Sequence, residues 1–116
     1  MGLMTTELNA MLDGRTYNGI SLHTADPGTN GANEVSGGTY ARATGLTFGA
    51  ASSGKRSCVT QPVMNVPAGT TVAWVGLWNS STFVGKYDVT NETFAADGTY
   101  TVTGPGGAGY AYVELT

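Results

Sequence analysis

The chain has 116 residues, of which 41% are hydrophobic and only 11% charged, with a formal net charge of −3. This length suits one domain over residues 1–116, and the hydrophobic content excludes disorder by composition. The five basic residues are scattered, so the chain lacks the basic stripe that would bind nucleic acids or anionic membranes. We therefore expect no nucleic acid and no membrane among its partners. A surface of Thr, Ser, Asn and Gly suits packing against other subunits, or alternatively a neutral β-sandwich that binds nothing large.

Cysteine content and the N-terminal sequence limit where the protein can be made. Cys58 is the only cysteine, so neither an intrachain disulfide nor a cysteine-based metal site can form. The first residues lack the basic start and long apolar run of a signal peptide. No stretch approaches the ~18 apolar residues of a membrane-spanning helix. We expect synthesis in a cytosol without secretion.

Residues 4–13 form the one predicted helix. Its apolar side chains recur at i, i+4, i+7 and i+8: Met4, Leu8, Met11 and Leu12. This spacing places them on one helix face. Thr5 or Thr6 is the expected N-cap and Gly14 the expected end. A helix this short is not stable alone, so we expect it to pack on its own sheet, with a neighbouring subunit as the alternative.

The next segment combines a strand with a long loop. Residues 20–24 alternate apolar and polar side chains, as a half-buried strand does. Residues 26–39 are rich in turn formers, including Asp26-Pro27-Gly28, and predict a long surface loop. Loops of this length tend to be functional or to be ordered by a partner. We consider this loop the first candidate for a partner contact.

The middle of the chain predicts three further strands. Residues 40–48 read as a strand interrupted by Gly45, and residues 56–66 as a strand broken by Pro62. Residues 71–78 carry apolar side chains on both faces, which predicts a central strand covered on both sides. Its tryptophans are expected in the core, although Trp78 at the strand end suits partial exposure. The alternative is an aromatic platform for sugars.

The C-terminal third continues the β pattern. A short loop at 79–82 joins the central strand to a strand at 83–87, and further strands are predicted at 99–102 and 110–115. Because turn signals separate short strands and no helix lies between them, a parallel α/β sheet is excluded. We predict an all-β fold, an antiparallel, jelly-roll-like β-sandwich of seven or eight strands with one short N-terminal helix.

Catalytic and metal-binding patterns are weak throughout. His23 is the only histidine, and Ser21, His23 and Asp26 are close in sequence but show no motif of a catalytic triad. The eight carboxylates are spread singly, and the glycine clusters match neither phosphate-binding nor dinucleotide-binding loops. We predict that the chain is not an enzyme. We also predict no catalytic residues, no cofactor-binding residues, no metal ligands and no cofactor.

Residues 22–42 resemble a family of small tailed-phage virion proteins, variously labelled tail fibre, minor tail or head decoration proteins. The resemblance rests on residues 22–28, 31–38 and 40–42, and it continues in order to about residue 103. Within that range it includes the segments 66–70, 74–78, 92–94 and 97–100. It implies a virion surface protein made in the host bacterial cytoplasm.

The resemblance implies a structural role whose position on the particle is open. The first expectation is a capsid decoration, or cement, protein that stabilises the head shell through non-covalent lattice contacts. Its partner would be the major capsid protein, and its state a homo-oligomer, with a trimer favoured. The second is a tail-associated fibre or minor tail module that contacts tail proteins and the host surface. A third, of another class, is a carbohydrate-binding module that uses Trp78 or tyrosines.

Overall fold

The computed structural model describes residues 3–107 and 109–114, which form one helix, one 3-10 turn and seven strands. The elements are α1 (Thr5–Asp13), β1 (Gly19–His23), β2 (Lys55–Ser57), β3 (Val63–Val66), β4 (Thr70–Asn79), β5 (Thr82–Phe94), β6 (Gly98–Thr101), η1 (Pro105–Gly107) and β7 (Tyr112–Glu114). Every strand pairing is antiparallel. The predicted antiparallel all-β fold with one short N-terminal helix is confirmed. The predicted strand at 110–115 is represented by β7, and its last residue lies outside the described residues.

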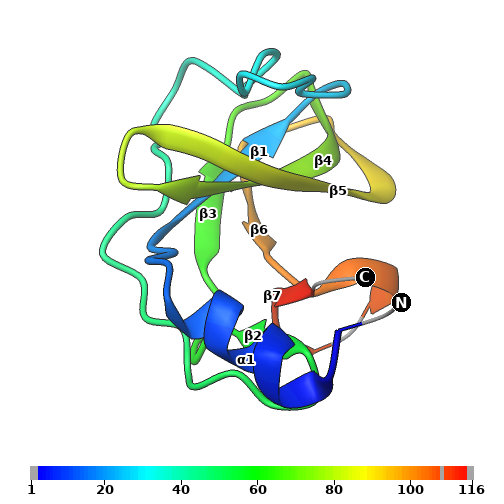
Figure 1. The fold of residues 1–116 in the computed structure, drawn as a ribbon. Helices are drawn as coiled ribbons and strands as arrows, with labels where there is room; N and C mark the ends of the chain where they lie inside the picture. The colour runs from blue at the N-terminus through cyan, green and yellow to red at the C-terminus, as the bar shows by residue number, and fades with distance from the viewer. Residues whose placement is uncertain (1–2, 108, 115–116) are drawn as a thin grey trace.

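The largest sheet has the order β1-β4-β5, with β4 at its centre (Figure 1). The hairpin turns at Ser80, whose φ of 54° is left-handed and suits a tight turn between β4 and β5. β5 is far longer than the predicted strand at 83–87, because its pairing with β4 continues past two register irregularities to Phe94 opposite Thr70. This long hairpin forms the body on which the remaining elements are arranged.

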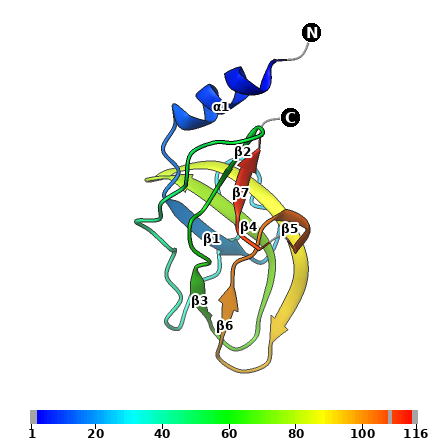
Figure 2. The same ribbon diagram turned by 90° about the horizontal axis from the view of Figure 1, so that it is seen from below.

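Two smaller sheets, β3-β6 and β2-β7, complete a sandwich-like layout (Figures 1 and 2). One face of the large sheet joins β3 and β6 in a single cluster of buried side chains. The cluster includes Ile20, Leu22, Val72, Val75, Met64, Val66, Tyr100 and Val102. The other face of β4 lies under the segment 26–39, where Gly31 approaches the Trp78 ring. β4 is therefore covered on both sides, as its sequence predicts.

The predicted strand at 40–48 is wrong. Only Ala43 and Phe48 in this segment make strand-like pairings, and each is an isolated bridge. Gly45 adopts a φ of 66°, which a regular strand cannot contain. Tyr40 and Arg42 instead direct their side chains to Glu34.

The predicted strand at 56–66 is divided into β2 and β3, which belong to different sheets. Pro62 lies in the break, as the sequence suggests. Its carbonyl accepts a hydrogen bond from the Val102 amide at 2.9 Å, but proline has no N–H with which to continue a ladder.

Helix α1 lies at one end of an elongated molecule of 47 × 26 × 25 Å and stands beside β2 (Figure 2). The predicted caps are only partly correct. Met4 occupies the N-cap position without a side-chain hydrogen bond, so neither Thr5 nor Thr6 caps the helix. Gly14 ends it as predicted, and its amide donates to the Ala10 carbonyl at 3.0 Å.

Candidate functional site

The long loop at 26–39 packs on the outer face of the β1-β4-β5 sheet. Pro27 and Val35 are buried, and the Val35 amide donates to the Leu22 carbonyl of β1 at 2.9 Å. At the start of the loop, the Asp26 carboxylate accepts a hydrogen bond from Lys86 of β5 at 2.7 Å. The predicted surface loop is therefore ordered by contacts within its own chain, and a partner is not needed to fix its course.

A closed hydrogen-bond network joins this loop to the sheet. His23 Nδ1 lies 2.7 Å from the Ala32 carbonyl oxygen, and His23 Nε2 lies 2.6 Å from Ser21 Oγ. Because a carbonyl only accepts, Nδ1 carries the proton and Ser21 donates to Nε2. Trp78 Nε1 in turn donates to Ser21 Oγ at 2.7 Å. The network holds a neutral histidine, and burial lowers the pKa of His23 below its usual 6.5.

The Ser21–His23 pair does not form an accessible catalytic triad. Asp26 is bound to Lys86, and the position of the third triad member is taken by the Ala32 carbonyl. Both Ser21 and His23 have no solvent-exposed surface, so a substrate carbonyl cannot reach the hydroxyl. Within residues 3–107 and 109–114, no three His, Cys, Asp or Glu side chains gather closely enough to hold a metal ion.

Glu34 forms a second polar cluster at the end of the loop. Its carboxylate accepts two bonds from Arg42, at 2.7 and 3.2 Å, and one from the Tyr40 hydroxyl at 2.8 Å. Burial opposes ionisation, but the hydrogen bonds from Arg42 and Tyr40 outweigh it and lower the pKa of Glu34. The Arg42 guanidinium also lies 3.5 Å from the centre of the Trp78 ring. Trp78 is thus covered on one side by a cation that is itself fixed by Glu34.

The pKa of His23 predicts a loss of stability in mild acid. The unfolded chain takes up a proton near pH 6.5, whereas the folded chain resists it, so the free energy of unfolding decreases as pH falls below 6.5. We expect a decrease of up to about 1.4 kcal/mol per pH unit, measured by urea unfolding at a series of pH values. Glu34 affects stability at lower pH, since its pKa lies below 4.5.

His23→Gln is the control for this pH dependence. The chain has no other histidine, and glutamine can present an oxygen to the Ser21 hydroxyl without titrating. The variant should be less stable at neutral pH, but its stability should be nearly constant between about pH 5 and 7. A variant that keeps the pH dependence of the natural chain would show that another group causes it.

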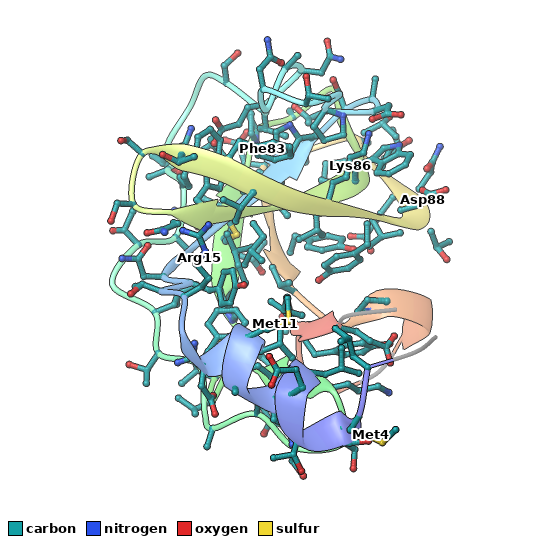
Figure 3. The ribbon with its side chains drawn as sticks, in the orientation of Figure 1. Met4, Met11, Arg15, Phe83, Lys86 and Asp88 are labelled. Carbon is teal, nitrogen blue, oxygen red and sulfur yellow. The ribbon has the colours of Figure 1, made fainter. Side chains whose placement is uncertain are left out.

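An apolar groove lies between the large sheet and the C-terminal end of the chain. It has a volume of about 670 Å³. Leu77, Val84 and Tyr87 line it from the hairpin side, and Val113 lines it from β7. Arg15 also lines it (Figure 3). These residues lie on segments far apart in the sequence, and only the fold brings them together.

A second hollow, of about 880 Å³, lies between the distal half of β5, β6 and η1. Its lining is polar and rich in small residues: Asp88, Thr90, Asn91, Glu92, Thr99, Thr101, Thr103 and Gly104 are among its members. Among the described residues that line it, Tyr100 is the one aromatic residue, and because Tyr100 is only 9% exposed it offers little ring surface for stacking.

The family model described as "Podophage GP4 fiber I protein gp80" matches residues 5–103. The chain belongs to this family. No curated protein matches the chain, and no solved structure does. The match confirms the resemblance to small tailed-phage virion proteins, and this gp80-family chain is a virion-associated structural protein of the fibre type. No described helix is long and apolar enough to cross a membrane.

The two tryptophans of this gp80-family chain differ in their exposure. Trp78, predicted in the core although its place at the strand end suits partial exposure, is only 7% exposed, whereas Trp74, also predicted in the core, is half-buried beside Lys86. The prediction that Trp78 belongs to the core is confirmed. Trp78 does not form an open sugar platform, because Arg42 lies over its ring and Phe83 packs at its edge. The residues that cover the Trp78 ring, Gly31 and Arg42, belong to one segment, so a prediction of the cover from sequence would have to come from residues 31–42.

Proposed function

We propose that this gp80-family chain is a non-enzymatic module of a tail-associated fibre. The observation that carries the proposal is the family match, which spans residues 5–103 and names a fibre protein. The structure agrees with a mechanical role: the molecule is elongated, and its one serine–histidine pair is sealed from solvent. A fibre module works by holding its shape and presenting surfaces to neighbours, and both polar clusters around Trp78 contribute to that rigidity.

We further propose that the module faces outward on the particle, where a fibre can meet the host surface. Low charge and many Thr, Ser, Asn and Gly residues suit repeated contacts with neighbouring proteins. Capsid decoration, with the major capsid protein as partner, and a trimeric state both stay predictions. No observation in the structure favours the head lattice over the tail.

The test is to locate the chain on particles. Purified virions should be separated into tails and DNA-filled or empty heads, and each fraction probed by quantitative mass spectrometry and by immunogold labelling with an antibody raised against the chain. We expect the chain in the tail fraction, with gold at the fibres and a copy number that matches them. Labelling spread over the head, or binding of the isolated protein to tailless heads, would overturn the proposal in favour of decoration.

A further inference from the structure

Helix α1 is attached to the rest of the chain by one face only. Asn9 Oδ1 accepts the Gly54 amide at 2.9 Å, and Asp13 Oδ1 accepts the Ala51 amide at 2.9 Å. Leu12 is the only buried apolar residue of the helix, at 1% exposure. These residues fall on adjacent positions of the helix, and the residues on its opposite face, among them Met4, Glu7 and Met11, are exposed.

The free face carries an apolar stripe interrupted by one acid. Met4, Glu7 and Met11 lie at i, i+3 and i+7, a spacing that places them on one side of the helix. Met4 is 75% exposed and Met11 is 49% exposed. We call these three residues the α1 stripe. A nine-residue helix gains most of its stability from packing, so this exposed stripe costs stability that a second contact would restore.

The apolar groove provides the complementary surface. Val84 at its rim is 45% exposed, and Leu77, Tyr87 and Val113 line its interior. Of the seven large hydrophobic residues that are exposed in the described part of the chain, three belong to the α1 stripe or to the groove rim: Met4, Met11 and Val84. Both of the features that would meet therefore carry exposed apolar surface, and a contact there would remove it from water.

Charge complementarity selects the occupant of the groove. Arg15 lines the groove, and Glu7 lies in the middle of the α1 stripe. In the part of the chain that the structure describes, neither Glu7 nor Arg15 takes part in an ion pair. The other two charged residues of the groove, Lys86 and Glu114, are each already paired, with Asp26 and Lys55. The groove thus presents an unpaired cation, and the stripe presents an unpaired anion between two apolar side chains.

We propose that the α1 stripe of one copy docks in the apolar groove of a second copy, with Met4 and Met11 on the apolar lining and Glu7 beside Arg15. The stripe and the groove are different surfaces of one chain, so the contact is completed either reciprocally in a dimer or around a closed ring. It does not depend on where on the particle the protein sits. The contact can therefore fail without affecting the fibre assignment, and the reverse also holds.

The test is a charge exchange followed by sedimentation equilibrium on the isolated chain. We expect the natural chain to associate as its concentration rises, and Glu7→Lys or Arg15→Glu alone to weaken association by about tenfold. Because each single variant places like charges together, the double variant Glu7→Lys/Arg15→Glu should recover most of the lost affinity. Far-UV circular dichroism should show the same fold in all four proteins, since both positions are exposed.

The apolar part of the contact has a matched control. Met4→Ser/Met11→Ser removes two exposed apolar side chains from the stripe, and Val59→Ser/Val63→Ser removes two equally exposed ones from elsewhere, at 55% and 62% exposure. The Met4→Ser/Met11→Ser variant should weaken association by more than about tenfold, and the Val59→Ser/Val63→Ser variant should leave association unchanged. The proposal is overturned by a natural chain that stays monomeric at every concentration. Equal effects of the two serine pairs, or a double charge variant no better than the singles, would overturn it as well.

Discussion

Gly76→Ala is expected to destabilise the fold by about 3 kcal/mol. A β-carbon at position 76 would lie 2.5 Å from Ser21 Oγ, 2.7 Å from His23 Nε2 and 2.8 Å from a Phe83 ring carbon. These atoms cannot move apart freely, because the Ser21 and His23 side chains are hydrogen-bonded to each other. His23 is also hydrogen-bonded to the Ala32 carbonyl of the loop. A single methyl group would therefore disrupt the network that holds the loop at 26–39 on the sheet. Urea unfolding followed by circular dichroism measures the change.

Gly85→Ala is the matched control for this substitution. Gly85 is on β5 and lies opposite Leu77 of the neighbouring strand β4. A β-carbon at position 85 would meet only Leu77 side-chain atoms, at 3.5 and 3.6 Å, which is ordinary van der Waals contact. Since alanine also suits a strand better than glycine, we expect this variant to be as stable as the natural chain or slightly more stable. Equal losses at the two positions would show that strand glycines are needed for backbone reasons, and that the packing around Gly76 is not special.

Trp78→Ala should cost about 4 kcal/mol, more than any other truncation on β4. The side chain is 7% exposed, and its loss would leave a cavity beneath Arg42 and beside Phe83. The Ser21 hydroxyl would also lose the hydrogen bond that it accepts from the indole. Circular dichroism is the suitable probe, because the substitution removes one of the two tryptophans and so changes the fluorescence signal.

Trp74→Ala provides the comparison, because it removes the same side chain from the same strand. Trp74 is half-buried and has Lys86 at 5.5 Å from its ring centre, so its truncation should cost about 1–2 kcal/mol. A larger loss at position 74 than at position 78 would contradict the cover that we describe for Trp78. The comparison also affects glycan-binding experiments. Loss of binding in Trp78→Ala would report unfolding, so of the two tryptophans only Trp74 can be substituted to test an aromatic sugar contact.

Much of the fold could be predicted from local patterns. The two-sided apolar run at 71–78 predicted a central covered strand, and β4 is the middle strand of the largest sheet. The 3.6-residue spacing at 4–13 predicted α1 within one residue of its observed start. In both cases the prediction rests on how apolar side chains repeat along one element. That repeat is set by the local backbone geometry, which determines the face to which each side chain points.

The candidate site was far less predictable. Residues 40–48 alternate like a strand, yet Tyr40 and Arg42 bind Glu34 in the preceding loop, and the segment makes only isolated bridges. A local pattern cannot show that a nearby carboxylate will compete for these side chains. The same limit explains why the sequence left partial exposure of Trp78 open: the cover of its ring comes from Gly31 and Arg42, more than thirty residues away in sequence.

The amino-acid sequence by itself determined the β class, the short helix and the absence of recognisable catalytic motifs, because composition and side-chain periodicity act within single elements. Tertiary structure decided which strands pair into which sheet, how the loop at 26–39 seals His23 and Trp78, and where the apolar groove forms. Pairings such as Gly19 with Trp78 join residues that are distant along the chain. Such contacts are selected by the packing of the whole core, and no single segment contains the information that specifies them.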